Sequence, residues 1–350
     1  MLKSDEHVWG IVLAAGQGSR VRGFLTQLCG GRGLKQFCAV TGSRSMLQQT
    51  LARVERIIPR ERILVIVSDT DRLEAREQLS AWPAENIIYQ PVDRGTAPGL
   101  LLPLVHVSRR DPAATVAVFP CDHFMLDEST FMTRVATAIS QIEQSPDELI
   151  LLGMKPDRPE QDFGWIEAFS DGNNEVSSRV WKFWEKPSAF KARELFSRGA
   201  LWNTFVFGVQ AHALWDLVLS RAPELYHSFR SIGLTLNGKH GQMYIDHIYN
   251  QIRTVDFSTE ILQHLAHRLR VLPVPEVGWS DWGTAERICD SLKTIGKLDE
   301  CFARLKQRKA DFATLKLVAG YLDHPTTTRR HSVMPALRSP QVMRNINPQN

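Results

Sequence analysis

The chain has 350 residues, a formal net charge of +4 at pH 7 and 43% hydrophobic residues. This hydrophobic content is typical of globular proteins and supplies enough apolar side chains for a large core. The 42 lysine and arginine residues are spread along the chain and form no dense basic stripe, which argues against a nucleic-acid-binding protein.

The cysteines and the N-terminus predict the compartment. The five cysteines form no CxxC pair and leave one odd thiol, so the sequence favours a reducing compartment over a disulfide framework or a zinc knuckle. The N-terminal residues MLKSDEHVW are polar, and no apolar run approaches the about 18 residues that a spanning helix needs. We therefore expect a cytoplasmic protein without a signal peptide and without a membrane segment.

The first element of the chain is an apolar run, Ile11 to Ala15, which is too short for a helix and predicts a strand buried on both faces of a parallel sheet. The sequence GQGSR follows, in which Gly16 and Gly18 let backbone N–H groups approach an anion. Arg20 and, after a long glycine-containing loop, Lys35 supply two cations. This combination predicts a polyphosphate site, although an ordinary βα turn with basic surface residues has the same pattern.

Two other nucleotide-binding motifs fit this stretch less well. The sequence contains no GxxxxGK[ST], which argues against a P-loop NTPase. The spacing of Gly16 and Gly18, followed by Val21, lacks the third glycine of the dinucleotide fingerprint, and no acidic residue follows at the expected distance. A Rossmann dehydrogenase is therefore a poor match.

Strands and helices alternate through residue 145. The expected strands are 62–68, 86–90 and 115–119, and the expected helices are 46–57, 69–79 and 96–109. This alternation predicts an α/β fold with a doubly wound, mostly parallel, Rossmann-like sheet. Ligands of such folds bind beyond the carboxyl ends of the strands.

The second half of the chain has a different pattern, which predicts a mixed insertion and a helical C-terminal piece. Strands are expected at 149–154, 162–168, 178–184, 201–209 and 268–274, and helices at 211–221, 284–292 and 297–309. From residue 323 the sequence is rich in Thr, Arg, Ser, Pro and Asn without periodicity, which predicts a disordered tail. We expect one α/β domain over 7–292, a helical segment over 293–322 and the tail over 323–350.

Two aspartates follow predicted strands at the edge where ligands are expected. Asp122 comes directly after strand 115–119, and Asp281 lies in the segment GWSDWG after the last strand. Mg²⁺ usually takes one or two carboxylates together with phosphate oxygens, so the pair could hold this ion. Each aspartate could instead be the N-cap of the helix that follows it.

Two further polar residues lie at the end of a predicted strand or inside one. Lys186 lies between Glu185 and Pro187, and the proline should hold it in an extended conformation at a strand end, where lysine can serve as a point charge for phosphate. An exposed Lys–Glu pair is the alternative. Asn203 lies inside an apolar strand and is suited to bind a hydroxylated ligand, although a structural hydrogen bond to nearby backbone is equally plausible. His123, next to Asp122, is interpreted as structural.

Taken in order, these segments resemble the sugar-1-phosphate nucleotidyltransferases, and among them the mannose-1-phosphate guanylyltransferases. The resemblance rests on eight segments between residue 11 and about 285: LAAGQGSR, KQF, QPVDRGTAP, VFPCDHFM, FGWIEA, VWKFWEKP, LWNTFVF and GWSDWGT. It implies the nucleotide-diphospho-sugar transferase fold and a reaction in which a hexose 1-phosphate attacks the α-phosphorus of an NTP, giving NDP-sugar and pyrophosphate. GTP, mannose 1-phosphate and Mg²⁺ are the implied substrates and cofactor, and a homodimer is left open.

The resemblance also implies a role for each matching residue. The triphosphate would be held by Ala15, Gly16, Gly18 and Arg20, and Lys35 would neutralise charge near the α-phosphate. Asp122 and Asp281 would coordinate Mg²⁺, and Lys186 would hold the sugar phosphate. Gly164, Glu185 and Asn203 would contact sugar hydroxyls, and Gln90 and Thr96 lie where the family recognises the base.

The sequence departs from the family pattern in two places. The stretch between Arg20 and Lys35 is several residues longer than usual and has Leu34 where the family has proline, so a longer lid over the phosphates is one interpretation. Gln90 stands where glutamate is usual, and only its amide oxygen can accept from guanine. Another NTP or sugar phosphate, or an inactive regulatory homologue that binds a nucleotide sugar, is therefore the alternative; a metal-dependent glycosyltransferase fits less well, because Asp122 has no DxD partner.

Overall fold

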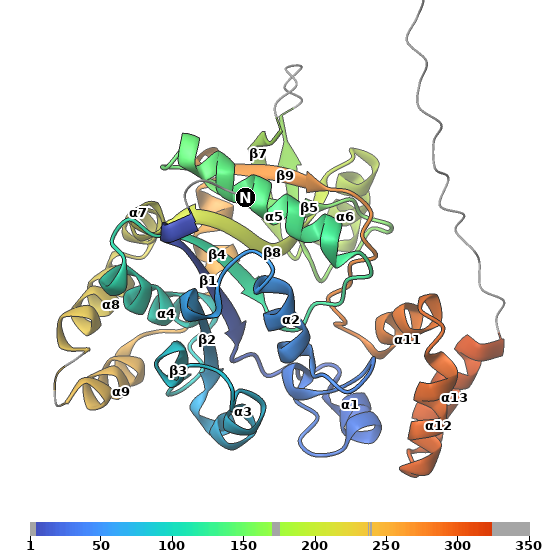
Figure 1. The fold of residues 1–350 in the computed structure, drawn as a ribbon. Coiled ribbons are helices and arrows are strands. Elements are labelled where there is room, and N and C mark those ends of the chain that lie inside the picture. Colours follow the sequence, from blue (N-terminus) through green and yellow to red (C-terminus); the bar gives the residue numbers. More distant parts are fainter. Residues whose placement is uncertain (1–4, 170–175, 237, 239, 324–350) are drawn as a thin grey trace, which may run out of the picture.

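The computed structural model describes residues 5–169, 176–236, 238 and 240–323. Within this part of the chain, nine strands form one sheet in the order β3-β2-β1-β4-β8-β5-β9-β7-β6 (Figure 1). The strands are β1 (Val8–Ala14), β2 (Ile63–Ser68), β3 (Ile87–Gln90), β4 (Thr115–Pro120), β5 (Leu149–Met154), β6 (Gly164–Ala168), β7 (Ser178–Glu185), β8 (Leu201–Gln210) and β9 (Leu269–Val274).

The sheet has a parallel half and a mixed half. Strands β3, β2, β1 and β4 are parallel to one another, as the alternating pattern predicted. Strand β8 is antiparallel to both β4 and β5, β9 is parallel to β5, and β6 and β7 form an antiparallel pair. Both the doubly wound fold and the mixed insertion are thus confirmed, and the polar residues that follow β1, β3 and β4 lie at one edge of the sheet.

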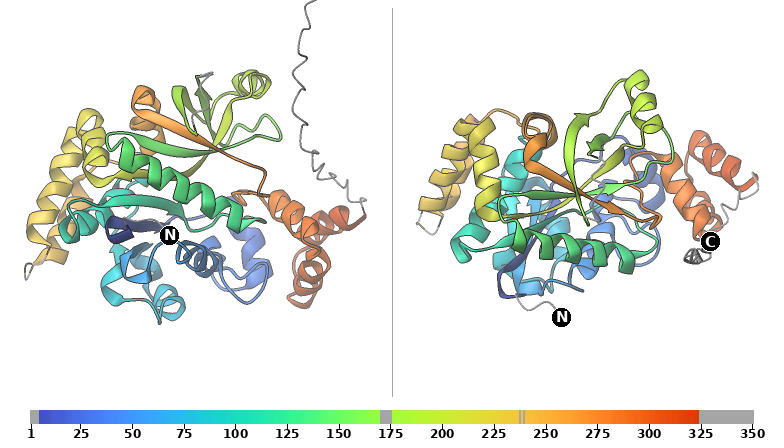
Figure 2. Two further views of the ribbon diagram at one scale, coloured as in Figure 1. Left: turned by 45° about the horizontal axis from the view of Figure 1, so that its top comes forward. Right: turned by 90° about the horizontal axis from the view of Figure 1, so that it is seen from above.

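Helices cover both faces of the sheet (Figure 2). One face packs against α4 (Thr96–Arg110), α7 (Ala211–Arg221), α8 (Pro223–Thr235), α9 (Gly241–Gln251) and α10 (Phe257–Glu260). The other face packs against α2 (Met46–Val54), α3 (Arg72–Gln78), α5 (Glu128–Gln144) and α6 (Ala189–Ser197). Among the described residues, no helix is both long enough and apolar enough to cross a membrane.

The stretch between Arg20 and Lys35 is not the loop that the sequence predicted. It contains a helix, α1 (Arg22–Cys29), which buries Leu25 and Leu28 in a third core. The partners of α1 are the C-terminal helices α11 (Ala285–Thr294), α12 (Leu298–Gln307) and α13 (Phe312–Asp323), which lie beside it in Figure 1. The apolar spacing of α1 is helical, and its core is completed by residues from the far end of the chain. The tail predicted from residue 323 falls at 324–350 outside the described residues.

The third core predicts a measurable cost for truncating α1. The Leu25 side chain is 0% exposed, so Leu25→Ala should lower the free energy of unfolding by about 2–5 kcal/mol through lost burial and a residual cavity. The matched control is Leu73→Ala in α3, where the side chain is 80% exposed and the expected change is within about 0.5 kcal/mol. Urea unfolding of the two variants and the wild type measures both effects. Equal stability of the two variants would contradict the burial of α1 against the C-terminal helices.

Candidate active site

The glycine loop after β1 packs directly on the segment that carries Lys35. The Gln36 amide donates to the carbonyls of Ala14 at 3.3 Å and Gly16 at 3.1 Å, which fixes the exit of the strand. Gly18 has φ +53°, and a Cβ added there would lie 3.3 Å from the Lys35 Cβ. This close approach and the left-handed conformation both favour glycine. The structure therefore brings Ala15, Gly16 and Gly18 next to Lys35, as the polyphosphate hypothesis requires.

Lys35 is buried and joins the two aspartate loops. Its Nζ lies 2.9 Å from Asp122 Oδ2 and also donates to the backbone carbonyl of Asp281. The loops themselves are paired, because Phe124 and Ser280 exchange backbone hydrogen bonds of 2.9 and 3.0 Å. Burial alone would raise the pKa of the Asp122 carboxyl, but the Lys35 ammonium holds this pKa below its usual range. The strand ends after β4 and β9 thus form one charged site.

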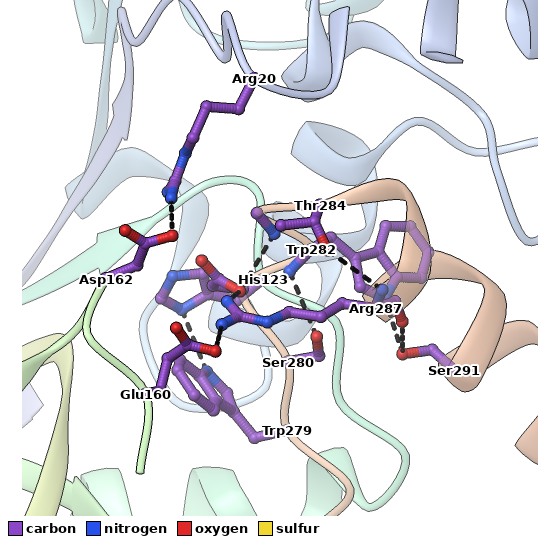
Figure 3. Close-up of polar contacts among 12 residues, drawn as sticks. Arg20, His123, Glu160, Asp162, Trp279, Ser280, Trp282, Thr284, Arg287 and Ser291 are labelled. Atoms are coloured by element: carbon purple, nitrogen blue, oxygen red, sulfur yellow. Dashed lines mark hydrogen bonds and ion pairs between the residues drawn. The ribbon is translucent and has the colours of Figure 1, made fainter. Parts of the chain in front are cut away.

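The Asp281 carboxylate is held by an arginine that sequence reasoning did not identify. Asp281 Oδ1 accepts from Arg287 Nη1 at 2.6 Å and from the Gly283 amide at 3.0 Å. Arg287 also pairs with Glu160, toward which it reaches in Figure 3, and its guanidinium lies 4.4 Å from the centre of the Phe163 ring. Burial alone would lower the pKa of Arg287, but the two carboxylates raise it above its ordinary value.

One feature of the sequence could have identified Arg287. It occupies the first turn of α11, where the helix dipole favours acidic rather than basic side chains. A cation at this position indicates a specific anionic partner. Its partner Asp281 comes six residues earlier, and the second partner, Glu160, comes from a distant segment that spacing alone does not reveal.

Arg20 reaches the same site from the side of the glycine loop. It pairs with Asp162, which sequence reasoning also missed (Figure 3). A Cβ added at Gly283 would lie 3.2 Å from Arg20 Nη2 and 2.5 Å from Asp281 Oδ2, so the side chain of Arg20 lies close to the Asp281 loop. The two side chains of the Arg20–Asp162 pair are 52% and 45% exposed, and such a pair contributes only about 0–1 kcal/mol. An incoming phosphate can therefore displace Asp162 at little cost.

The donors of the site fit one magnesium ion bound together with phosphate. Asp122 Oδ1 and Asp281 Oδ2 make no hydrogen bond to another residue in the described part of the chain, so each aspartate keeps one oxygen for a cation. No group of three or more His, Cys, Asp or Glu side chains suited to a metal occurs among the described residues, and Mg²⁺ needs no such group when phosphates complete its shell. The alternative role as helix caps is wrong, because Asp127 caps α5 and Thr284 caps α11.

Three residues predicted to contact sugar hydroxyls come together from β6, β7 and β8. A Cβ added at Gly164 would lie 2.9 Å from Glu185 Oε2 and 3.2 Å from the Asn203 Cβ. Burial raises the pKa of the Glu185 carboxyl, and Asp256 adds to this effect. Asn203 Oδ1 accepts from the Phe205 amide at 3.1 Å, which is the structural hydrogen bond considered as the alternative, and the Asn203 amide nitrogen has no hydrogen bond within the described residues.

Lys186 departs from its predicted conformation. Its φ is +43°, so it is left-handed rather than extended. The chain must turn between the end of β7 and Ser188, which caps α6, and the Lys186 amide is held there by the Phe163 carbonyl at 3.2 Å. This turn outweighs the extended preference that Pro187 imposes. The Lys186 side chain is 62% exposed and its Nζ lies 3.4 Å from Glu185 Oε1, so the cation projects beside the Glu185 carboxylate.

Gln90 and Thr96 flank the loop between β3 and α4. Gln90 is 3% exposed; its amide nitrogen donates to Val92 O at 3.0 Å, while its buried Oε1 has no partner. The Thr96 hydroxyl donates to Asp256 Oδ2 at 3.0 Å and accepts from the Phe257 amide at 2.7 Å. Thr96 is thus engaged within the protein, whereas Gln90 presents an orphaned acceptor. Asp256, which influences both Thr96 and Glu185, is a further residue that sequence reasoning missed.

Comparisons with known proteins identify the family. The sequence model of the family described as nucleotidyl transferase matches residues 9–297. The mannose-1-phosphate guanylyltransferase of Salmonella muenchen is 29% identical, with 81% of this chain and 59% of its own length covered. The alginate biosynthesis protein AlgA of Pseudomonas syringae pv. tomato is 31% identical, with 62% of this chain and 44% of its own length covered. The chain thus spans about half the length of these curated relatives.

Solved structures show the same fold. A protein of Thermus thermophilus, described as a mannose-1-phosphate geranyltransferase, superimposes with a TM-score of 0.69 at 24% identity, over 80% of this chain and 77% of its own. The family model covers most of the chain, and the fold and the order of the matching segments agree with it. The chain belongs to the nucleotidyl transferase family.

Proposed function

We propose that the protein transfers a nucleotidyl group from GTP to mannose 1-phosphate, giving GDP-mannose and pyrophosphate. The observation that carries this proposal is the buried Lys35 ammonium, which lies against the glycine loop and pairs with Asp122. A fixed cation beside open backbone amides and carboxylates with free oxygens suits a polyphosphate bound with a metal ion. Family membership and the names of the relatives supply the substrate class.

The proposed reaction is a direct displacement. A phosphate oxygen of the sugar phosphate attacks the α-phosphorus of the NTP, the bond to the bridging oxygen of the β-phosphate breaks, and pyrophosphate leaves. The protein contributes positioning and charge stabilisation, which are strongest where water is excluded. The Lys35 ammonium would stabilise negative charge at the α-phosphate. Arg20 would release Asp162 and bind the triphosphate instead. Bound Mg²⁺, held by Asp122 and Asp281, would neutralise phosphate charge.

We assign recognition of the two substrates to two separate groups of residues. The orphaned Gln90 Oε1 would accept from the guanine N1–H or amino group, which would supply the partner that this buried oxygen lacks. Glu185, Asn203 and the backbone of Gly164 would bind sugar hydroxyls, and Lys186 would hold the sugar phosphate. The left-handed turn at Lys186 supports this role, because strained backbone is often retained at ligand sites.

The first test measures pyrophosphate release from the purified full-length protein with Mg²⁺, each of four NTPs and a panel of hexose 1-phosphates. We expect release with GTP and mannose 1-phosphate. Asp122→Asn should reduce the rate by at least about 10²-fold while retaining the fold, since the loss of charge stabilisation at a metal–phosphate site costs several kcal/mol. Release with another NTP would reassign the base. Tight binding of GDP-mannose without any release would instead support a regulatory homologue.

The assignment of Lys186 can be tested separately. Lys186→Ala should raise the KM for the sugar phosphate roughly 10- to 100-fold, because hydrogen bonds to charged groups contribute about 1.5–3 kcal/mol, and should leave the KM for the NTP unchanged. The matched control is Lys182→Ala on β7, where the exposed lysine lies 4.0 Å from the centre of the Trp184 ring. An increase in the KM for the NTP, or an equal effect of both substitutions, would remove Lys186 from the sugar-phosphate site.

A further inference from the structure

A cavity of about 580 Å³ lies beside β3, the strand at one edge of the sheet. Most of its walls come from β3, the C-terminal half of α4 and the first turns of α9, which Figure 1 shows on the side of the molecule away from α11 to α13. Thr96 begins α4 and Arg109 lies in its last turn, so the base loop and the cavity are separated by roughly 20 Å along the helix axis. The proposed reaction uses none of the side chains that line the cavity, which therefore calls for a separate explanation.

Two neighbouring guanidinium groups at this cavity make hydrogen bonds only to neutral acceptors. Arg109 donates to the Gly233 carbonyl, and Arg110 donates to Asn86 Oδ1 and to the Glu85 carbonyl, both at 2.5 Å. Neither arginine forms an ion pair with a carboxylate in the described part of the chain. Glu85, the one acidic residue among the described residues that line the cavity, meets Arg110 with its backbone rather than with its carboxylate. The cavity therefore carries positive charge that an anion could neutralise.

The titration of His106 reflects this positive charge. His106 lies one turn before Arg110 on α4 and also lines the cavity. Burial, together with the charges of Arg110 and Arg109, lowers the pKa of His106 to about 4. His106 is therefore neutral at pH 7 and adds a hydrogen-bonding group without adding charge.

The remaining walls of the cavity suit a planar or apolar group. The guanidinium of Arg72 lies 3.7 Å from the centre of the Tyr89 ring, and its Nε donates to Asp69 Oδ1 at 2.9 Å. Asp69 offsets the charge of Arg72, so the Arg72–Tyr89 pair offers a planar surface on which a ligand can stack. The buried part of the wall is apolar and consists of Ile88, Leu102 and Ile245. Sites for small molecules have volumes of about 300–1,000 Å³, and a bare phosphate ion would leave most of this cavity empty.

We propose that this cavity is a second binding site, which takes an organic phosphate that carries a planar group, as a nucleotide does. The phosphate lies against the guanidinium groups of Arg109 and Arg110. A phosphomonoester carries about −1.5 to −2 charge at pH 7, which suits two adjacent arginines without carboxylate partners. The planar group stacks on Arg72 and Tyr89. Binding at this site does not depend on the proposed function, because the two sites share no residue.

The test titrates the purified full-length protein with AMP in a calorimeter, and with adenosine and inorganic phosphate in separate runs. AMP is the chosen nucleotide because its base differs from the guanine proposed for the active site. We expect AMP to bind at least about tenfold more tightly than adenosine or inorganic phosphate, since each of these fragments reaches only one part of the cavity. A Kd for AMP weaker than about 1 mM would overturn the proposal. Equal affinities for AMP and inorganic phosphate would also overturn it, because the planar group would then contribute nothing.

Variants decide whether AMP binds in this cavity or in the proposed active site. Arg109→Gln should weaken AMP binding roughly 10- to 100-fold, as expected for the loss of a hydrogen bond between charged groups. The matched control is Arg193→Gln in α6, an exposed arginine on a helix that covers the other face of the sheet, and it should leave the affinity unchanged. Arg20→Gln, in the proposed active site, should also leave the affinity unchanged. AMP binding that is lost in Arg20→Gln and retained in Arg109→Gln would overturn the proposal.

A second substitution adds a negative charge to the cavity instead of removing a positive one. Gln242 lines the cavity from the first turn of α9, where its side chain is exposed and where the helix dipole favours an acidic residue. Gln242→Glu should therefore keep the fold, which thermal unfolding checks, while its carboxylate repels the phosphate and weakens AMP binding roughly tenfold. The control is Gln251→Glu at the other end of α9, which is exposed and does not line the cavity. Equal affinities of these two variants for AMP would contradict binding in this cavity, whichever substrates the protein turns over.

Discussion

The ammonium group of Lys35 is the charge on which the geometry of the site depends. Removing such an ion from water costs several kcal/mol unless partners compensate it. Lys35 is 5% exposed, and its partners are the Asp122 carboxylate and the Asp281 carbonyl, which belong to loops after two different strands. Moving either loop away would leave a buried charge with too few partners. The electrostatic requirement of one lysine therefore holds together strand ends that lie far apart in the sequence.

The two arginines of the site differ in how easily they can exchange partners. Arg20 and Asp162 are both about half exposed, so solvent screens their attraction and a phosphate can replace the carboxylate. Arg287 is 7% exposed and lies between Glu160 and Asp281. Removing one of these carboxylates would leave a buried charge with too few partners and would cost several kcal/mol of folding stability. Arg287 is accordingly a fixed part of the structure that orients Asp281, whereas Arg20 is the cation that can change its partner.

The sequence predicted the features that depend on local pattern. Apolar runs placed the strands, and because parallel strands end at one edge, Asp122 was expected near the glycine loop. Patterns that depend on distant partners were missed or misread. Helix α1 was read as a loop because glycines follow it and because its buried face is completed by α11 to α13. Pro187 alone predicts an extended Lys186, whereas the chain makes a left-handed turn there, and the Lys186 amide donates to the carbonyl of Phe163, which directly precedes β6.

Leu34 occupies the position before Lys35 at which the family has a proline, and packing explains how leucine can take its place. Leu34 adopts φ −71°, a value that proline would impose, and it is 3% exposed. Proline fixes this angle in the unfolded chain as well, which is worth about 0.4–1 kcal/mol, whereas leucine must be held by its surroundings. Farther along the same segment, Lys297 donates to the Thr41 carbonyl and Arg304 donates to Val40 O at 3.1 Å. The C-terminal helices therefore hold the backbone that follows the short turn containing Lys35.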